Sequence, residues 1–114
     1  MPTEQEKAAL YNLLLVKYRM LVSYGQGLLK RRNQRNERVV NIELGRTDLE
    51  MKLLEATMSA MNSGIEMQFP SNERITELRS AVARMDQILG QNAAVNDVVK
   101  AADALIDAWP DFDL

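Results

Sequence analysis

The strongest chemical signal in the sequence is a basic run between residues 30 and 38, which holds five cations and no apolar side chain. Arginine forms paired hydrogen bonds to phosphate, and each neutralised phosphate releases a counterion, so such a run can bind nucleic acid or a nucleotide. The structural alternative is a solvated helix end, because cations are favoured near the carboxyl end of a helix. The candidate anion-binding or partner-binding residues are Lys30, Arg31, Arg32, Arg35 and Arg38.

The overall charge of the chain favours a solvated helix end over an anion-binding site at the basic run. Residues 17–38 carry seven positive charges and one negative charge, whereas residues 86–114 carry one positive and six negative charges. The formal net charge of the whole chain is −2 and the isoelectric point is about 5.2. A nucleic-acid-binding domain is usually basic overall, and the run lacks the interleaved aromatic residues that stack on bases. Nucleic acid or nucleotide binding is therefore the second interpretation.

The carboxyl-terminal segment alternates hydrophobic residues with carboxylates. Such a segment can dock into an apolar groove with a basic rim on a protein partner. It can instead cover the end of the chain's own bundle, or fold back on the basic run and screen it. The candidate partner-binding tail comprises Trp109, Asp111, Phe112, Asp113 and Leu114.

The first helical segment carries polar groups within an unusually wide apolar arc of roughly 200°, compared with about 100° for a surface helix. A helix with this pattern is expected to pack on two sides, and one side could meet a second copy of the chain. A lysine and tyrosines there could line a pocket between copies, or belong to an ordinary core with the ammonium group reaching water. The candidate self-association face comprises Leu10, Tyr11, Leu14, Lys17, Tyr18, Leu21 and Leu28.

Catalytic chemistry finds little support in the residue types. The chain has no Cys and no His, so it lacks thiol nucleophiles, imidazole bases and the common zinc ligands. The best carboxylate pairs are Glu50 with Glu55 and Glu73 with Glu77, and helix capping or surface exposure accounts for both. No glycine-rich phosphate loop follows a strand pattern. We expect no enzyme activity, no cofactor and no metal.

Four helical segments must position these residues, over about 4–34, 48–62, 72–89 and 93–109, followed by an acidic tail at 110–114. Thr3 is the expected cap of the first helix, and the interval 30–44 is ambiguous. Thr47 and Glu50 form a capping-box pattern that predicts the start of the second helix. Its expected core stripe is Leu49, Leu53, Ala56 and Ala60, widened by Leu54, Met58 and Met61.

The third and fourth helices have clearer boundaries. Ser71 is placed to cap the third helix and Gly90 to end it. Asn92 or Asn96 is expected to cap the fourth helix, and Pro110 to end it. Their predicted core residues are Ile75, Leu78, Val82, Met85 and Leu89 in the third helix, and Val95, Val98, Val99, Ala102, Leu105, Ile106 and Trp109 in the fourth.

The sequence thus predicts an all-α protein, a single domain over 1–114 that folds as a compact antiparallel bundle of about four helices with a long first helix. The polar start lacks the basic region of an export signal, and Lys17 and Arg19 interrupt the most apolar stretch, so we expect a cytoplasmic protein without a membrane partner. The expected function is that of a small adaptor, inhibitor or regulator, which binds a protein partner and forms a homo-oligomer.

Overall fold

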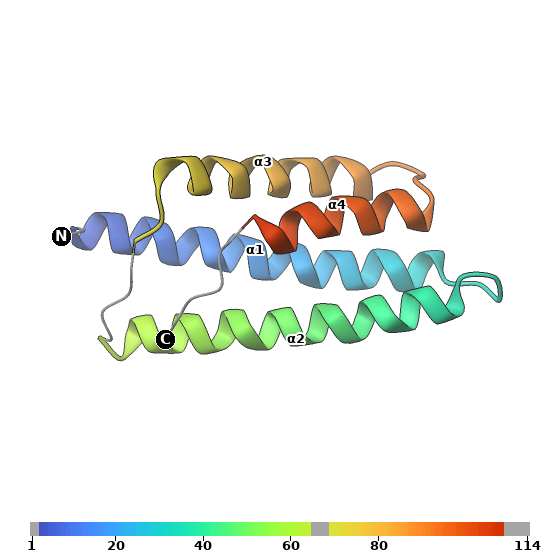
Figure 1. The fold of residues 1–114 in the computed structure, drawn as a ribbon, viewed down its shortest axis with the longest axis horizontal. Coiled ribbons are helices and arrows are strands. Elements are labelled where there is room, and N and C mark those ends of the chain that lie inside the picture. The colour runs from blue at the N-terminus through green and yellow to red at the C-terminus, as the bar shows by residue number, and fades with distance from the viewer. Residues whose placement is uncertain (1–2, 65–68, 109–114) are drawn as a thin grey trace.

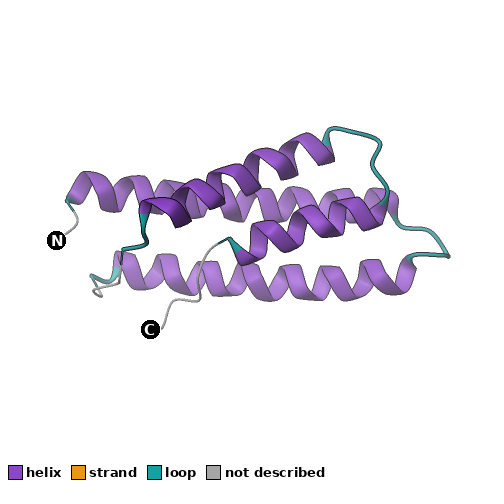
Figure 2. Cartoon of the chain, turned by 45° about the horizontal axis from the view of Figure 1, so that its top comes forward, coloured by secondary structure: helices purple, strands orange, loops and turns teal. Residues whose placement is uncertain are grey.

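The chain forms four α-helices that pack along one another in a bundle (Figures 1 and 2). The structure is a computed structural model, and it describes residues 3–64 and 69–108. The helices are α1 (Glu4–Arg31), α2 (Glu37–Asn62), α3 (Asn72–Leu89) and α4 (Val95–Asp107). The bundle measures 50 × 22 × 17 Å. The predicted all-α bundle with a long first helix is confirmed.

Helix α1 lies at the centre and contacts each of the other three helices. Its leucines at positions 10, 14, 21 and 28 are buried, as is Tyr24. Neighbours on more than one side require an apolar arc wider than that of a surface helix, which explains the arc seen in the sequence. Figure 1 shows α2 on one side of α1 and the α3–α4 pair on the other. Within the described ranges α2 contacts α1 and α4 but not α3.

Several predicted helix ends are confirmed. Thr3 caps α1 in a reciprocal capping box, in which the Thr3 hydroxyl accepts from the Glu6 amide and the Glu6 carboxylate accepts from the Thr3 amide. Ser71 caps α3 by accepting from the Arg74 amide, and Gly90 follows its last residue. The prediction for α4 is wrong, because its N-cap is Ala94 and no side chain caps it. Pro110 lies outside the described residues.

Helix α2 begins eleven residues earlier than predicted, at Glu37 rather than 48, and α1 ends at Arg31 rather than 34. The capping-box interpretation of Thr47 is wrong. This residue lies inside α2, where its hydroxyl donates to the Glu43 carbonyl one turn earlier, at 2.7 Å. A threonine can bond to a carbonyl within its own helix as well as cap a new one, so the local pattern fits both structures. Gly45 also lies inside α2 and does not end a helix.

The predicted core stripe of α2 is wrong for three of its four residues. Leu49 and Leu53 are 59% and 50% exposed, Ala56 is exposed, and only Ala60 is buried. Leu54 and Met58, which were expected to widen the stripe, are buried as predicted. The other residues of α2 that face the core are Val40, Glu43, Thr47, Thr57 and Ala60. Val40, Thr47 and Leu54 recur every seven residues, so they form the seam that packs against the other helices. Leu49 and Leu53 lie on a neighbouring side of α2, at the surface.

A tight connection at residues 32–36 joins α1 to α2. The Asn33 side chain accepts from the Arg35 and Asn36 amides, and the Asn36 side chain accepts from the Asn33 amide. The Asn36 side chain also donates to the Arg31 carbonyl at 2.9 Å, at the end of α1. The connection is therefore held by its own side chains. Across residues 3–64 and 69–108, every helix is too short or too polar to span a bilayer.

Candidate interaction surface

The surface of α2 carries a row of large apolar side chains that no other part of the described chain covers. Val39 is 44% exposed, Ile42 62%, Leu49 59% and Leu53 50%. Their positions, with Arg46 in the middle, advance by alternate steps of three and four residues, so they lie along one side of the helix. We call these four residues the α2 stripe.

The grouping of these side chains distinguishes the α2 stripe from an ordinary surface. The described residues include three other exposed large aliphatic side chains, Val16, Val22 and Leu29, and all three lie on α1. Single exposed apolar residues are normal in soluble proteins, whereas a contiguous apolar patch marks a site of interaction. The α2 stripe is therefore the candidate site.

A polar cluster beside the stripe fixes the position of α2. The Tyr24 hydroxyl of α1 donates to the Glu43 carboxylate at 2.7 Å, and the Arg46 guanidinium donates to the same carboxylate at 2.8 Å. Arg46 also pairs with Asp103 of α4 at 2.6 Å. The cluster thus links three helices around the buried Glu43 carboxylate. Among the described residues, the buried Nε of Arg46 has no hydrogen-bond acceptor.

The ionisation of this cluster follows from its burial together with its hydrogen bonds and charges. Burial raises the pKa of Tyr24 well above its ordinary value, and the hydrogen bond to the Glu43 carboxylate raises it further. Burial acts against the charge on Arg46, but the hydrogen bond to Asp103 and the charge of Glu43 outweigh it, so the pKa of Arg46 is raised. Tyr24 therefore stays protonated and Arg46 stays charged, as an internal ion pair requires.

The predicted anion-binding residues differ in their surroundings, because Arg31 is partly buried and the other four are exposed. Arg31 is directed inward, and its guanidinium donates to three backbone carbonyls, those of Gly27 at 3.1 Å, Gln91 at 2.9 Å and Ala93 at 2.8 Å. It ties the end of α1 to the connection between α3 and α4. Arg32 is exposed and lies 3.4 Å from the Asn41 side chain. The other predicted residues, Lys30, Arg35 and Arg38, are exposed.

The predicted self-association face lies largely within the chain's own core. Five of its residues are buried, namely Leu10, Leu14, Lys17, Leu21 and Leu28, while Tyr11 and Tyr18 are half-buried. The Lys17 ammonium donates to the Ile106 carbonyl near the end of α4 at 3.3 Å. The Tyr18 hydroxyl donates to Glu55 of α2 at 2.8 Å. The width of this face is thus accounted for by contacts within one chain.

The predicted partner-binding tail lies outside the described residues, from Trp109 through Asp111, Phe112 and Asp113 to Leu114. All three interpretations of that tail therefore stay predictions. No sequence signal singled out the α2 stripe as exposed, because its leucines were assigned to the core. The exposure of Val39 and Ile42 had no earlier sign either, since the conformation of residues 30–44 was ambiguous.

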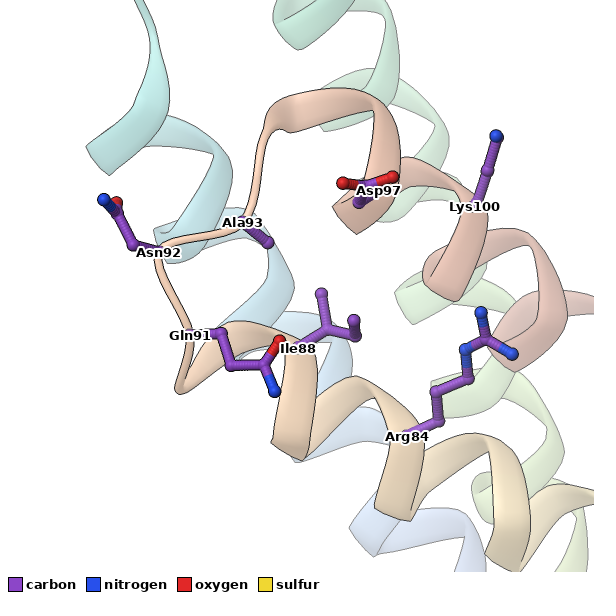
Figure 3. A pocket seen from close by; sticks show the side chains of 7 residues that line it. All are labelled: Arg84, Ile88, Gln91, Asn92, Ala93, Asp97 and Lys100. Atoms are coloured by element: carbon purple, nitrogen blue, oxygen red, sulfur yellow. The ribbon is translucent and has the colours of Figure 1, made fainter.

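Pockets also open at the surface of the described part of the bundle, and two of them differ in their lining. The larger, of about 400 Å³, lies between α3 and α4 and is lined by Arg84, Ile88, Asp97 and Lys100 among others. Figure 3 shows Arg84 and Lys100 on the same side of this pocket, and Asp97 at the start of α4. The smaller, of about 290 Å³, lies near the start of α1 and α3. Neither pocket is lined by the Tyr24–Glu43–Arg46 cluster.

Within residues 3–64 and 69–108, no three side chains of the metal-binding types Asp, Glu, His and Cys come together as a metal site. The chain matches no protein-family model, no curated protein and no solved structure.

Proposed function

We propose that this protein is a small, non-enzymatic interaction protein that binds a macromolecular partner through the α2 stripe. The observation that carries the proposal is the exposure of Val39, Ile42, Leu49 and Leu53 along one side of α2. Their exposed fractions together equal about two whole side chains. Burying one such side chain contributes about 1.5–3 kcal/mol, so covering the stripe would contribute roughly 3–6 kcal/mol.

The position of α2 also supports this role. The helix packs against α1 and, in part, against α4, and the described part of the chain leaves its other sides uncovered. The Tyr24–Glu43–Arg46–Asp103 cluster anchors it to both neighbours. A partner would therefore meet a helix already held in place, and binding would require little ordering of the backbone. The ionisable groups of the cluster join helices and line neither pocket, which favours a binding role over catalysis.

The experiment that tests the proposal compares three forms of the chain as bait in a lysate of the source organism. The wild-type chain is expected to retain a defined partner or further copies of itself, and Leu49→Ser combined with Leu53→Ser is expected to lose them. Leu29→Ser is the matched control, because Leu29 is 52% exposed but lies on α1. Exposed substitutions change stability by only about 0.5 kcal/mol, so all three forms should fold. Identical retention by wild type and the double variant would refute the proposal.

Binding of an anionic ligand such as nucleic acid or a nucleotide is the second candidate, and one observation favours it. Lys30, Arg32, Arg35 and Arg38 are all exposed in or beside the connection between α1 and α2, which its asparagines hold in place. Binding through these cations should weaken steeply with salt concentration. Fluorescence anisotropy of a labelled oligonucleotide tests this with Arg32→Ala, Arg35→Ala and Arg38→Ala combined. Binding that is absent, or unaffected by the triple substitution, would exclude the second candidate.

A further inference from the structure

We propose that the occupant of the α2 stripe is a second copy of this chain, packed against the same stripe in the antiparallel direction. The inference rests on the proposed function, namely that the stripe is a binding surface, and it names the partner. It differs from the self-association face predicted on α1, because that face is largely buried within one chain.

The spacing of the stripe is the same when it is followed in the opposite chain direction, so two copies of α2 can pack against each other antiparallel. The four stripe residues, taken with Arg46 between them and Ala56 after them, advance by alternate steps of three and four, as in the seam of a two-stranded helical contact. When two such helices run antiparallel about an axis between residues 47 and 48, Ile42 faces Leu53 of the second copy and Val39 faces Ala56. Each of these contacts occurs twice, because a two-fold axis brings the same patch of both copies together.

The charges near the axis complement one another in this arrangement. Arg46 faces Leu49 of the second copy and lies beside Glu50 of that copy. The Arg46 side chain is still 34% exposed. Glu50 is half-buried, and its side chain forms no ion pair or hydrogen bond within residues 3–64 and 69–108. Two symmetric Arg46–Glu50 pairs therefore flank the axis and favour this register.

The direction of packing also follows from charge. In a parallel pair, the basic connections of the two copies would lie side by side, each with Lys30, Arg32, Arg35 and Arg38. In an antiparallel pair they lie at opposite ends of the contact. Residue 37, where α2 begins, lies about 10.5 residues from the axis, so the two helix starts are roughly 32 Å apart at 1.5 Å per residue. Repulsion between like charges thus disfavours the parallel pair.

The test measures mass and direction together. Sedimentation equilibrium over a dilution series should give twice the chain mass of 12.9 kDa at high concentration. The chain has no cysteine, so a spin label can be placed at one position through Asp48→Cys or Ser59→Cys, both exposed sites. Residue 48 lies beside the proposed axis, so its labels should be roughly 20 Å apart for helices packed at 8–10 Å. Labels at residue 59 should be about 35 Å apart or more, given the axial rise of 1.5 Å per residue.

Matched variants keep the result interpretable. Leu49→Ser with Leu53→Ser should yield a monomer with unchanged helical circular dichroism, and Leu29→Ser should remain a dimer. A wild-type monomer at every concentration would overturn the inference, as would equal short distances at both labels or a dimer that survives the double substitution. A dimer that forms only after residues 109–114 are deleted would also overturn the inference, because the full chain would then be a monomer. If the chain is monomeric but retains another protein through the stripe, the dimer inference fails and the proposed function stands. If the chain neither dimerises nor retains another protein through the stripe, the dimer inference and the proposed function both fail.

Discussion

Replacing Tyr24 by phenylalanine is expected to destabilise the fold by about 2 kcal/mol, because the hydroxyl it removes serves a buried carboxylate. Tyr24 is 0% exposed, and Glu43, which accepts its hydrogen bond at 2.7 Å, is 9% exposed. After the change, Arg46 is the remaining side-chain donor to Glu43. A hydrogen bond to a charged group contributes about 1.5–3 kcal/mol, and a carboxylate that lacks its donor cannot recover it from water at this depth.

Tyr18→Phe is the matched control for this prediction. It removes the same hydroxyl from a bond of nearly the same length, 2.8 Å to Glu55, but at the exposed surface. Water can replace the lost donor there, so the change should be within about 0.5 kcal/mol. Urea unfolding followed by circular dichroism gives both values, and thermal unfolding should show a decrease in Tm of about 8 °C or more for Tyr24→Phe. Equal losses for the two variants would refute the argument that burial of Glu43 makes the Tyr24 bond stabilising.

Three further predictions concern pH, Gly45 and Arg31. Above about pH 10 the unfolded chain loses the Tyr24 proton, whereas the folded state keeps it. The free energy of unfolding should therefore fall above that pH by up to about 1.4 kcal/mol per pH unit. Urea unfolding at several pH values should show a smaller slope for Tyr24→Phe. Gly45→Ala should raise the free energy of unfolding by about 0.5–1 kcal/mol in chemical denaturation, since Gly45 lies inside α2 and a Cβ there would contact nothing within 4 Å. Arg31→Ala should destabilise the fold by about 1–3 kcal/mol in thermal or urea unfolding, because it removes three side-chain hydrogen bonds, two of them partly buried. Exposed Arg35→Ala should change the stability by about 0.5 kcal/mol or less. Unchanged stability of Arg31→Ala would return that residue to the anion-binding candidates.

Helix boundaries set by local chemistry could be predicted from the sequence. Ser71 and Gly90 bound α3 as predicted, because a hydroxyl cap and a terminal glycine act within one turn of the chain. The wide arc of α1 also indicated its central position correctly. These features depend on residues close to one another in the sequence, so the pattern contains the necessary information.

Features that depend on distant partners could not be predicted. Thr47 looked like a helix boundary, and only the packing of Val40 and Leu54 against the bundle shows that α2 continues through it. Helical periodicity identifies apolar stripes but does not say which stripe meets a neighbour. The stripe that contains Leu49 and Leu53 was therefore predicted to lie in the core, although it lies at the surface of the bundle.

The same limit applies to the candidate site. Arg31 looked like part of a solvated basic run, yet its acceptors at Gln91 and Ala93 are about sixty positions away in the chain. Glu43 is an unusual core residue, since a buried carboxylate requires donors, and these come from α1 and from its own helix. No local sequence pattern predicts the hydrogen-bond partners of Arg31 or of Glu43. The exposed α2 stripe became visible only when the packing of α2 was known.

The order of the helices along the bundle has a consequence for how the chain folds. Helices α1 and α2 are adjacent in sequence and in space, and so are α3 and α4, so each pair can form as a hairpin with a short loop-closure step. The bond from Lys17 to the Ile106 carbonyl, by contrast, joins residues 89 positions apart. We therefore expect the hairpins to be structured in the transition state and the α1–α4 contact to form late. Substitutions at the α1–α4 contact would therefore mainly accelerate unfolding and change the folding rate little. This contact would thus set the lifetime of the native state.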